Sequence, residues 1–275
     1  MSTGDSLRAA VEAWTRLLGE ANVRTDDETI ARYARTTQDA APRPGCVVFP
    51  ESTEQVQEVV RIAGRHGVVV YPISRGRNWG YGDACAPTPG AAIVDLSRMN
   101  TILEVNTELA YAVIQPGVSQ GQLYAHLAGH KTGLWMDSTG AGPESSLVGN
   151  TLDRGFGHTR YGDHFETCCG MEVVLADGTA VYDSAVICEY LDTLGSGPQL
   201  FPPFAAGSSD RLRVLTQGAL GDGILDAALL IVYEGRFRPE NMAVQSWVDR
   251  QHARIDRAVA LLEKAPPAFN GTPNY

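Results

Sequence analysis

The sequence predicts a protein of the α+β class, because it combines a βαβ unit with short strands joined by turns. The βαβ unit occupies residues 45–74, where an apolar strand, a helix that begins at Ser52 or Thr53 and a second strand follow one another. Such a unit implies parallel strands and a right-handed crossover. Short strands separated by turn residues are expected at 91–97, 101–106 and 110–117. The segment 171–183 has an Asp-Gly turn between two β-rich runs, which is typical of a hairpin.

Helices and one long loop complete the prediction. The N-terminal segment has apolar residues at helical spacing and stops at Gly19. The apolar face of this helix comprises Leu7, Val11, Trp14 and Leu18. Further helices are predicted after Ser119 and over 246–264, and the apolar run 225–236 is predicted as a last strand. Residues 137–150 are small and polar, and we expect a flexible loop there that could lie against a ligand.

Composition excludes several classes of function. The chain has 275 residues and a net charge of -10, which disfavours binding to nucleic acids or to anionic membranes. No segment approaches the roughly 20 consecutive apolar residues of a membrane span, and charged residues interrupt the apolar N-terminal stretch, so neither a span nor a signal peptide is predicted. We therefore expect a cytoplasmic protein. Its five cysteines include no C-x-x-C pair and are expected to be free thiols.

A metal site is not predicted. His126 and His130 are four residues apart on an expected helix, a spacing that can bind a metal. The sequence shows no third ligand near them, and packing at the end of a helix explains both residues better.

The segment 74–82 is the first candidate for a binding site. It reads Ser-Arg-Gly-Arg-Asn-Trp-Gly-Tyr-Gly and follows a predicted strand directly. Glycines and small polar residues allow backbone N–H groups to converge on a phosphate. The spacing is neither that of the Rossmann loop nor that of the Walker loop, and a purely structural glycine turn is the alternative.

The segment 74–82 belongs to the first of four motifs that follow one another along the sequence. They are P-x-S-x-G-R-N-x-G-Y-G from residue 72, L-W-x-D from residue 134, G-N-x-x-x-R-G-x-G-x-T-x-Y-G-D-H from residue 149, and G-M-E-V-V-L-A-D-G from residue 170. With these motifs the chain resembles the FAD-binding domain of the vanillyl-alcohol oxidase and p-cresol methylhydroxylase family over roughly residues 25–185. Within that family it looks most like the branch that oxidises 4-alkylphenols, which includes eugenol oxidases.

The resemblance implies a two-subdomain fold that holds an extended FAD. Residues 1–186 would form the FAD-binding domain, with a pyrophosphate loop at 74–82 and a flavin-ring segment at 149–164. The implied FAD-binding residues are Ser74, Arg75, Gly76, Arg77, Asn78, Gly82, Gly149, Asn150, Leu152, Gly162, Asp163, His164, Val173 and Val174. Some relatives carry a flavin-linking His where this chain has Asn78, so the FAD is expected to be bound non-covalently.

The resemblance also implies three catalytic residues. Tyr81 matches a tyrosine that hydrogen-bonds the phenol oxygen of the substrate; its alternative is packing over the glycine loop. Asp153 matches a position beside the reactive flavin nitrogen; its alternatives are a salt bridge with Arg154 and a helix cap. His158 and Arg160 stand where relatives usually have Tyr and Pro, and His158 could replace a missing phenol ligand.

The family's substrate cap domain has no counterpart that we recognise in the sequence. Residues 187–275 diverge, and we expect them to complete the domain or to form an interface in a homodimer or heteromer. The expected function is that of an FAD-dependent oxidoreductase that transfers hydride from a phenolic, 4-alkylphenol-like or related aromatic substrate to flavin. The alternatives are an inactive flavin-binding protein and a flavoprotein subunit completed by a partner chain.

Overall fold

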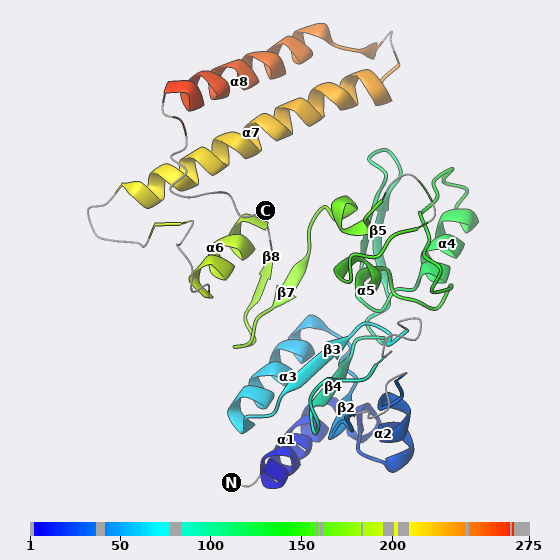
Figure 1. Ribbon diagram of the computed structural model, residues 1–275. Helices are drawn as coiled ribbons and strands as arrows, with labels where there is room; N and C mark the ends of the chain where they lie inside the picture. Colours follow the sequence, from blue (N-terminus) through cyan, green and yellow to red (C-terminus); the bar gives the residue numbers. More distant parts are fainter. Residues whose placement is uncertain are drawn as a thin grey trace. The chain divides into compact units, whose positions relative to one another are not determined.

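A computed structural model gives the arrangement of the chain (Figure 1). It describes residues 3–36, 42–77, 84–157, 159, 162–182, 184–194, 201–202, 209–239, 242–264 and 266. The chain divides into two compact units, Met1–Val186 and Ile187–Tyr275. Each unit is described separately.

A four-stranded sheet forms the first half of the N-terminal unit. Its strands are β1 (Val23–Arg24), β2 (Cys46–Val48), β3 (Val70–Ile73) and β4 (Ala92–Asp95). Their order is β1-β2-β4-β3, in which β1 is antiparallel and the other three strands are parallel. The predicted βαβ unit is therefore present, but β2 and β3 are not neighbours, because β4 lies between them and pairs with both.

Helices cover both faces of this sheet. On one face α1 (Thr3–Leu18) and α3 (Thr53–His66) pack over alternate residues of β2 and β4, among them Cys46 and Val94. On the other face α2 (Asp27–Tyr33) packs over Val47 and Ile93. Burial on both faces explains the continuous apolar runs of these strands. Figure 1 shows α1 and α3 side by side, and the indole Nε1 of fully buried Trp14 donates to the Val59 carbonyl oxygen at 3.1 Å.

The helix ends follow the predicted capping residues. Ser52 caps α3, because its side chain accepts a hydrogen bond from the Gln55 N–H, and Gly67 ends the helix with a φ of 63°. Gly19, with a φ of 84°, follows the last residue of α1. A short 3₁₀ helix, η1 (Glu20–Asn22), then leads into β1.

A second small core lies in the same unit. It is built on the antiparallel pair β5 (Ile102–Asn106) and β6 (Tyr111–Ile114), with α4 (Gln120–Gly129) and α5 (Leu147–Leu152). Val118, Leu123 and Leu127 form its buried centre. Ser119 and Gln122 form a capping box at the start of α4. The predicted loop at 137–150 is wrong at its end, because Ser146 caps α5 and residues 147–150 are helical.

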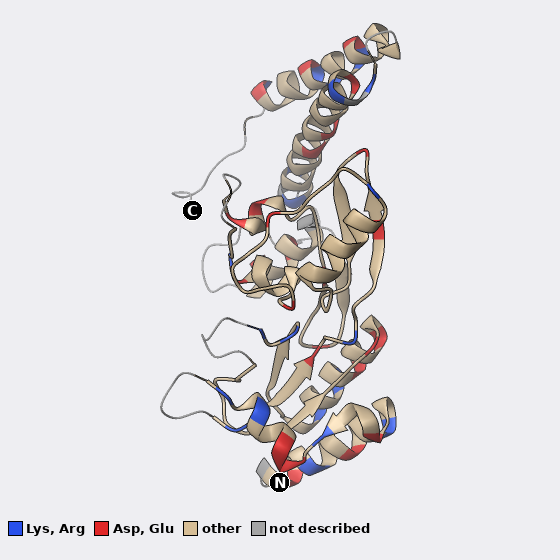
Figure 2. Ribbon diagram, turned by 90° about the vertical axis from the view of Figure 1, so that its right-hand side faces the viewer, with Lys and Arg blue, Asp and Glu red and all other residues tan. Residues whose placement is uncertain are grey.

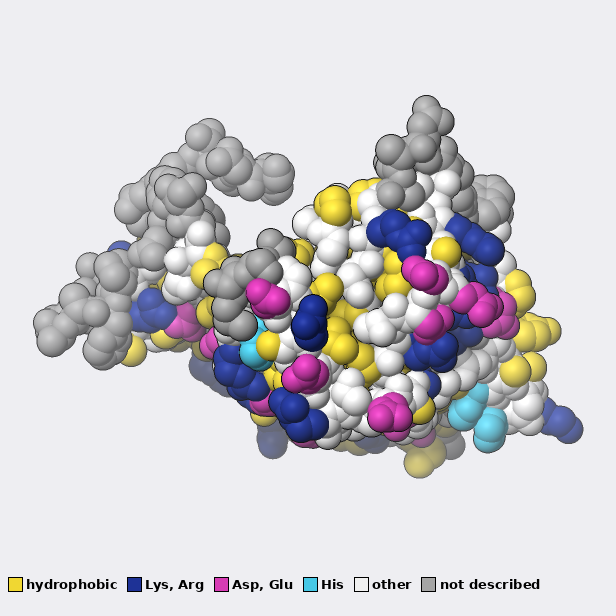
Figure 3. All heavy atoms as spheres, turned by 90° about the horizontal axis from the view of Figure 1, so that it is seen from below, with side chains coloured by type: hydrophobic (Ala, Val, Ile, Leu, Met, Phe, Trp, Pro, Cys, Tyr) yellow, Lys and Arg dark blue, Asp and Glu magenta, His cyan; other side chains and the backbone are white. Residues whose placement is uncertain are grey.

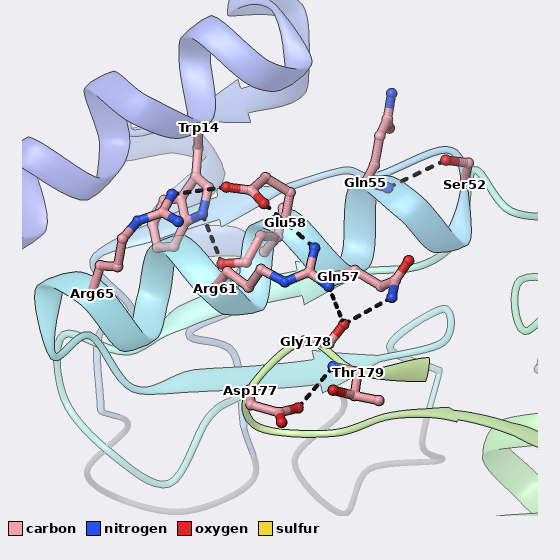
Figure 4. Close-up of polar contacts among 11 residues, drawn as sticks. Trp14, Ser52, Gln55, Gln57, Glu58, Arg61, Arg65, Asp177, Gly178 and Thr179 are labelled. Atoms are coloured by element: carbon pink, nitrogen blue, oxygen red, sulfur yellow. Dashed lines mark hydrogen bonds and ion pairs between the residues drawn. The ribbon is translucent and has the colours of Figure 1, made fainter. Parts of the chain in front are cut away.

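The predicted hairpin at 171–183 is confirmed and rests on α3 (Figure 4). Its strands β7 (Glu172–Val174) and β8 (Ala180–Tyr182) pair antiparallel, and Gly178 in the turn has a φ of 81°. The Gly178 carbonyl oxygen accepts hydrogen bonds at 2.8 Å from the side chains of Gln57 and Arg61 on α3. A 3₁₀ helix, η2 (His164–Thr167), precedes the hairpin.

The C-terminal unit is helical in its described part. Helix α6 (Ser184–Leu194) spans the boundary between the units, and α7 (Asp210–Phe237) packs against α8 (Gln245–Lys264). The prediction of a strand at 225–236 is wrong, because this run is the second half of α7. Its Ala and Leu residues favour a helix, and a run of this length fits a helix better than a strand.

Helix α7 also corrects the expectation about membranes. Its segment Arg211–Arg236 is long and apolar enough to cross a membrane by length and composition, and it is the one such helix among the described residues. One helix of this kind is weak evidence for a span.

Charges of both signs are distributed over the described surface. Figure 2 shows acidic and basic residues together on several helices, among them α1, α3, α7 and α8, whereas α4 and α5 carry no charged residue. On the face shown in Figure 3, Lys and Arg side chains lie among Asp and Glu side chains, with hydrophobic side chains between them. The net charge of -10 therefore leaves room for local positive groups that can bind an anion.

Candidate FAD site

The first site segment follows β3 directly. Among the described residues, none accepts a hydrogen bond from the backbone N–H groups of Ser74, Arg75, Gly76 and Arg77. Gly76 has a φ of 60°, and a Cβ on it would lie 2.8 Å from the Cβ of Ala84, so a glycine is required here. Four consecutive unpaired donors on a tight turn are suited to an anion such as a pyrophosphate.

The side chain of Arg75 has a structural role. Its guanidinium donates at 2.8 Å to the Glu144 carbonyl oxygen, at 2.8 Å to the Glu144 carboxylate and at 3.0 Å to the Gly117 carbonyl oxygen. These bonds tie the loop after β3 to the segments that flank α4. The contribution of Arg75 to a phosphate site is therefore limited to its backbone. Arg77, in contrast, is exposed and has no ion-pair partner in the described part of the chain.

The loop after β3 and helix α5 approach each other closely. A Cβ on Gly149 would lie 3.3 Å from the Ser74 Oγ, so position 149 has little room for a side chain. The Ser74 hydroxyl makes no hydrogen bond within the described residues. The structure thus brings together two segments that are 75 residues apart in the sequence and that were both predicted to contact FAD.

A polar cluster lies at the far end of α5. The Nδ1 of His164 lies 2.6 Å from the Asn150 Oδ1, and the Nε2 of His164 lies 3.2 Å from the Asp137 Oδ2. The same Asp137 oxygen accepts a hydrogen bond from the Thr159 hydroxyl at 2.8 Å. The side chains of His164 and Asp137 are only 13% and 10% exposed. Since both ring nitrogens of His164 are occupied within the protein, its ring is not free to donate to a ligand.

Asp153 is the C-cap residue of α5 and is exposed. The alternative of a salt bridge with Arg154 is not observed, because Arg154 donates to Asp163 at 2.6 Å instead. The carboxylate of Asp153 has no hydrogen bond or ion pair with the described residues. It is therefore available to a ligand or to solvent.

The surroundings of Asp153 are partly apolar. Leu152, Phe156 and Phe165 are 55%, 66% and 40% exposed, which is unusual for side chains of this size. Asp163 caps η2. The hydrogen bond from the Phe165 N–H lowers the pKa of the Asp163 carboxyl group, and the Arg154 guanidinium lowers it further. Gly162 precedes Asp163 with a φ of 72°. The flavin-ring segment thus contains exposed apolar side chains and, in Asp153, a carboxylate without a partner among the described residues, while the Arg154 guanidinium lies over the Phe165 ring, 5.3 Å from its centroid.

The remaining predicted residues fall into two groups. Val173 and Val174 are half-buried in β7, on the hairpin that rests on α3. Asn78, Tyr81, Gly82 and His158, together with Arg160, lie outside the described residues. Their predicted contacts with FAD or substrate stay predictions.

No group of three or more His, Cys, Asp or Glu side chains suited to a metal occurs in the described parts of the chain. The rings of His126 and His130 stack with their centroids 4.2 Å apart at the end of α4. Cys168 and Cys169 are free thiols.

The residues present fit an FAD. The N–H groups after β3, which have no acceptor in the described part of the chain, and the cationic Arg77 suit its pyrophosphate. The close approach of Ser74 to Gly149 places the flavin-ring segment beside them. The apolar side chains around Asp153 suit an aromatic ring system.

Comparisons with known proteins agree with this assignment. A family model described as an FAD binding domain matches residues 44–183, about half of the chain. The chain belongs to this family, in the form found in p-cresol methylhydroxylase and vanillyl-alcohol oxidase. The predicted α+β FAD-binding fold and the predicted family are thereby confirmed.

Three relatives show how far the similarity extends. The chain is 42% identical over 172 residues to 1'-carboxy-chondrochloren decarboxylase of Chondromyces crocatus, covering 62% of this chain and 32% of that protein. It is 38% identical over 179 residues to the 4-cresol dehydrogenase [hydroxylating] flavoprotein subunit of Pseudomonas putida, covering 64% and 34%. The structure of 4-ethylphenol oxidase from Gulosibacter chungangensis in its isoeugenol complex matches with 34% identity and a TM-score of 0.63, covering 76% and 40%. The chain thus spans about a third of the length of these curated relatives.

The sequence interpretation missed two site residues, Asp137 and Glu144. Asp137 belongs to the L-W-x-D motif, so the motif gave a signal for it, but its partner His164 could not be inferred from spacing. Glu144 lies in the segment predicted as a flexible loop, and no pattern in the sequence connects it to Arg75.

Proposed function

We propose that this protein is an FAD-dependent oxidoreductase that acts on a phenolic, 4-alkylphenol-like or related aromatic substrate. The observation that carries the proposal is the set of four N–H groups at Ser74–Arg77 that have no acceptor among the described residues and lie beside Gly149 of the flavin-ring segment. Membership of the FAD-binding family supports the cofactor. The names of two relatives, a 4-cresol dehydrogenase subunit and a 4-ethylphenol oxidase, support the substrate class.

The residues of this chain have distinct roles in the proposed reaction. FAD accepts the hydride that the substrate loses. The N–H groups of residues 74–77 and the side chain of Arg77 bind its pyrophosphate. Asp153 holds or takes up a proton beside the reacting carbon, because its carboxylate has no partner of its own in the described residues. Tyr81 binds the phenol oxygen and favours the phenolate, which pushes electron density toward the para carbon.

Two alternatives remain within the proposal. In the first, the chain binds FAD but does not turn over. In the second, it is one subunit of a complex, which the name of the 4-cresol dehydrogenase flavoprotein subunit supports. The exposed side chains of Leu152 and Phe156 favour the second alternative, because a partner surface over them would exclude water from the reacting atoms.

An absorption spectrum of the purified protein, before and after acid precipitation, tests the cofactor. We expect a flavin spectrum whose chromophore is released into the supernatant, since the FAD is proposed to be non-covalent. A yellow pellet contradicts non-covalent binding, and a colourless protein that does not bind added FAD contradicts the whole proposal.

Anaerobic addition of a 4-alkylphenol tests the activity. Bleaching of the flavin supports the oxidoreductase, and an unchanged spectrum supports a flavin-binding protein without turnover. Bleaching that occurs only after a partner protein is added supports the subunit alternative.

A further inference from the structure

The polar cluster of Asp137, His164 and Asn150 has a role beyond the contacts predicted for FAD. We propose that Asp137 is a positioning residue of the FAD site, which through His164 fixes the side-chain amide of Asn150 in the flavin-ring segment. This inference rests on the proposed function. It adds Asp137, a residue for which no contact with FAD was predicted and which contacts His164 and Thr159 of the flavin-ring segment.

Asp137 is well placed to fix the position of His164. Its backbone is anchored, because the neighbouring Leu134 and Met136 pack against the second core of the N-terminal unit. Its carboxylate accepts hydrogen bonds from two sides, from the His164 Nε2 and from the Thr159 hydroxyl. Since the carboxylate is 10% exposed, water competes little for these bonds.

His164 transmits this constraint to α5. Its ring lies between the Asp137 carboxylate and the side-chain amide of Asn150, with the Nε2 3.2 Å from the Asp137 Oδ2 and the Nδ1 2.6 Å from the Asn150 Oδ1. The backbone reinforces the link, because the His164 N–H donates to the Gly155 carbonyl oxygen at 2.9 Å and the Gly155 N–H donates to the Asn150 carbonyl oxygen at 2.8 Å. The side chain of Asn150 is thereby held against the His164 ring on the flavin-ring segment.

Two glycines leave the space that this cluster needs. A Cβ on Gly157 would lie 2.6 Å from the Asp137 Oδ2 and closer still to its Oδ1. A Cβ on Gly155 would lie 2.7 Å from the Asn150 Oδ1 and closer still to its Nδ2. Neither glycine has a positive φ, so space and not backbone conformation explains the R-G-x-G part of the motif.

Variants of the 275-residue chain test the role of Asp137. They are Asp137→Ala, Asp137→Asn, Gly157→Ala and the double variant Asp137→Ala/Gly157→Ala. Glu166→Ala is the matched control, because Glu166 lies on the same 3₁₀ helix as His164 and has no hydrogen-bond or ion-pair partner for its side chain in the described residues. Three quantities are measured: the FAD dissociation constant, the visible circular dichroism of the bound flavin, and the unfolding midpoint without FAD.

We expect Asp137→Ala to weaken FAD binding about tenfold, the loss of one hydrogen bond to a charged group, and to change the flavin dichroism. Asp137→Asn should keep most of the parent's FAD affinity and flavin dichroism, since its amide oxygen can still accept a hydrogen bond from His164. Gly157→Ala should behave like Asp137→Ala, because the new methyl group displaces the carboxylate. The double variant should be no worse than either single variant, because removal of the carboxylate makes room for the methyl group.

Several outcomes overturn the inference. If Asp137→Ala lowers the unfolding midpoint but leaves FAD affinity and dichroism unchanged, Asp137 is only structural. If the loss of FAD affinity in the double variant equals the sum of the losses in the two single variants, Gly157 is not required to make room for the Asp137 carboxylate. If the parent protein binds no FAD, the proposed function fails and this role fails with it, whereas normal FAD binding in Asp137→Ala overturns the role of Asp137 alone.

Discussion

Asp153 is exposed, carries a negative charge at the carboxyl end of α5 and has no partner in the described residues. A negative charge at this end of a helix is unfavourable, so folding does not explain it. We expect Asp153→Asn to lower the rate of flavin reduction by about 10²–10⁴-fold, the usual contribution of a general base. Stopped-flow reduction by a 4-alkylphenol, with the FAD content of the variant checked first, measures this change.

The control for Asp153→Asn is Glu166→Gln, which removes a nearby exposed carboxylate that has no proposed role. Both variants should leave the free energy of unfolding within about 0.5 kcal/mol of the parent. If the Asp153→Asn variant keeps its flavin and this flavin is reduced at the parent rate, Asp153 is not the group that takes up the proton.

Cys46 and the exposed cysteines should differ in reactivity. Burial raises the pKa of the Cys46 thiol from 9.0 to about 12, so the native thiol stays protonated and unreactive. We expect iodoacetamide to alkylate Cys169 and Cys188, which are exposed, well before Cys46 in the folded protein. Mass spectrometry of peptides from a time course measures the order, and equal rates at Cys46 and Cys169 contradict the packing of β2.

The same shift predicts a pH dependence. In the unfolded chain the Cys46 thiol ionises near 9.0, whereas in the folded protein it ionises only near 12. Between these values the unfolded state binds fewer protons, so the free energy of unfolding should fall as the pH rises through this window. Urea titrations at several pH values give the free energy of unfolding of the parent and of Cys46→Ala as a function of pH. If this free energy falls no more steeply with pH in the parent than in Cys46→Ala, the pKa shift is contradicted.

At the residue scale, sequence motifs supplied most of the residues that are proposed for the site. Ser74 and Gly149 were both predicted to bind FAD, and the structure places them in contact. For Arg75 a backbone contact with FAD was predicted and stays a prediction, while its side chain binds Glu144 and the Gly117 carbonyl oxygen, a role that the motif did not indicate. A motif identifies residues that contact a ligand or support its site, and only the three-dimensional arrangement separates the two.

At the element scale, the variant Gly178→Ala tests how much the contact between the β7–β8 hairpin and α3 contributes to stability. A Cβ on Gly178 would lie 2.6 Å from the Arg61 side chain and 2.7 Å from the Gln57 carbonyl oxygen. Gly133→Ala is the matched control, because Gly133 has a similar φ of 73° but no neighbour within 4 Å of a Cβ. The control isolates the cost of an alanine at positive φ.

We expect Gly133→Ala to cost about 1 kcal/mol of unfolding free energy, and Gly178→Ala to cost about 1–3 kcal/mol more because it also separates the hairpin from α3. Chemical denaturation of both variants measures the difference. Equal losses in the two variants show that the contact with α3 contributes nothing.

At the element scale, local signals predicted the elements that they determine. The cap at Ser119 and the hairpin turn at Gly178 are formed by neighbouring residues, and both predictions are confirmed. The run 225–236 was assigned wrongly, because a buried strand and a helix share the same apolar composition. The place of β4 between β2 and β3 depends on contacts between distant residues, which no local pattern specifies.

At the scale of the whole molecule, the C-terminal unit has more exposed apolar surface than a small helical unit needs. On α7, Leu225, Leu229 and Val232 are 69%, 47% and 53% exposed, and their spacing places them on one helical face. We therefore propose that this unit contributes to a homodimer or heteromer, and we expect light scattering to show association at micromolar concentration.

A double variant, Leu225→Glu/Leu229→Glu, should shift the protein toward the monomer. Leu103→Glu is the control, since Leu103 is 60% exposed in β5 of the N-terminal unit. A parent protein that is already a monomer, or equal association of both variants, contradicts an interface on α7.

The strand order β1-β2-β4-β3 has a consequence for the synthesis of the protein. Within the sheet β3 pairs only with β4, and β2 pairs only with β4 and with the two-residue β1. Until the ribosome has released residues 92–95, the two earlier parallel strands have no common neighbour. The nascent chain therefore carries the apolar strand Cys46–Val48 and helix α3 without their sheet, and the sheet closes only when its central strand, the last of the four to be made, is inserted between the others.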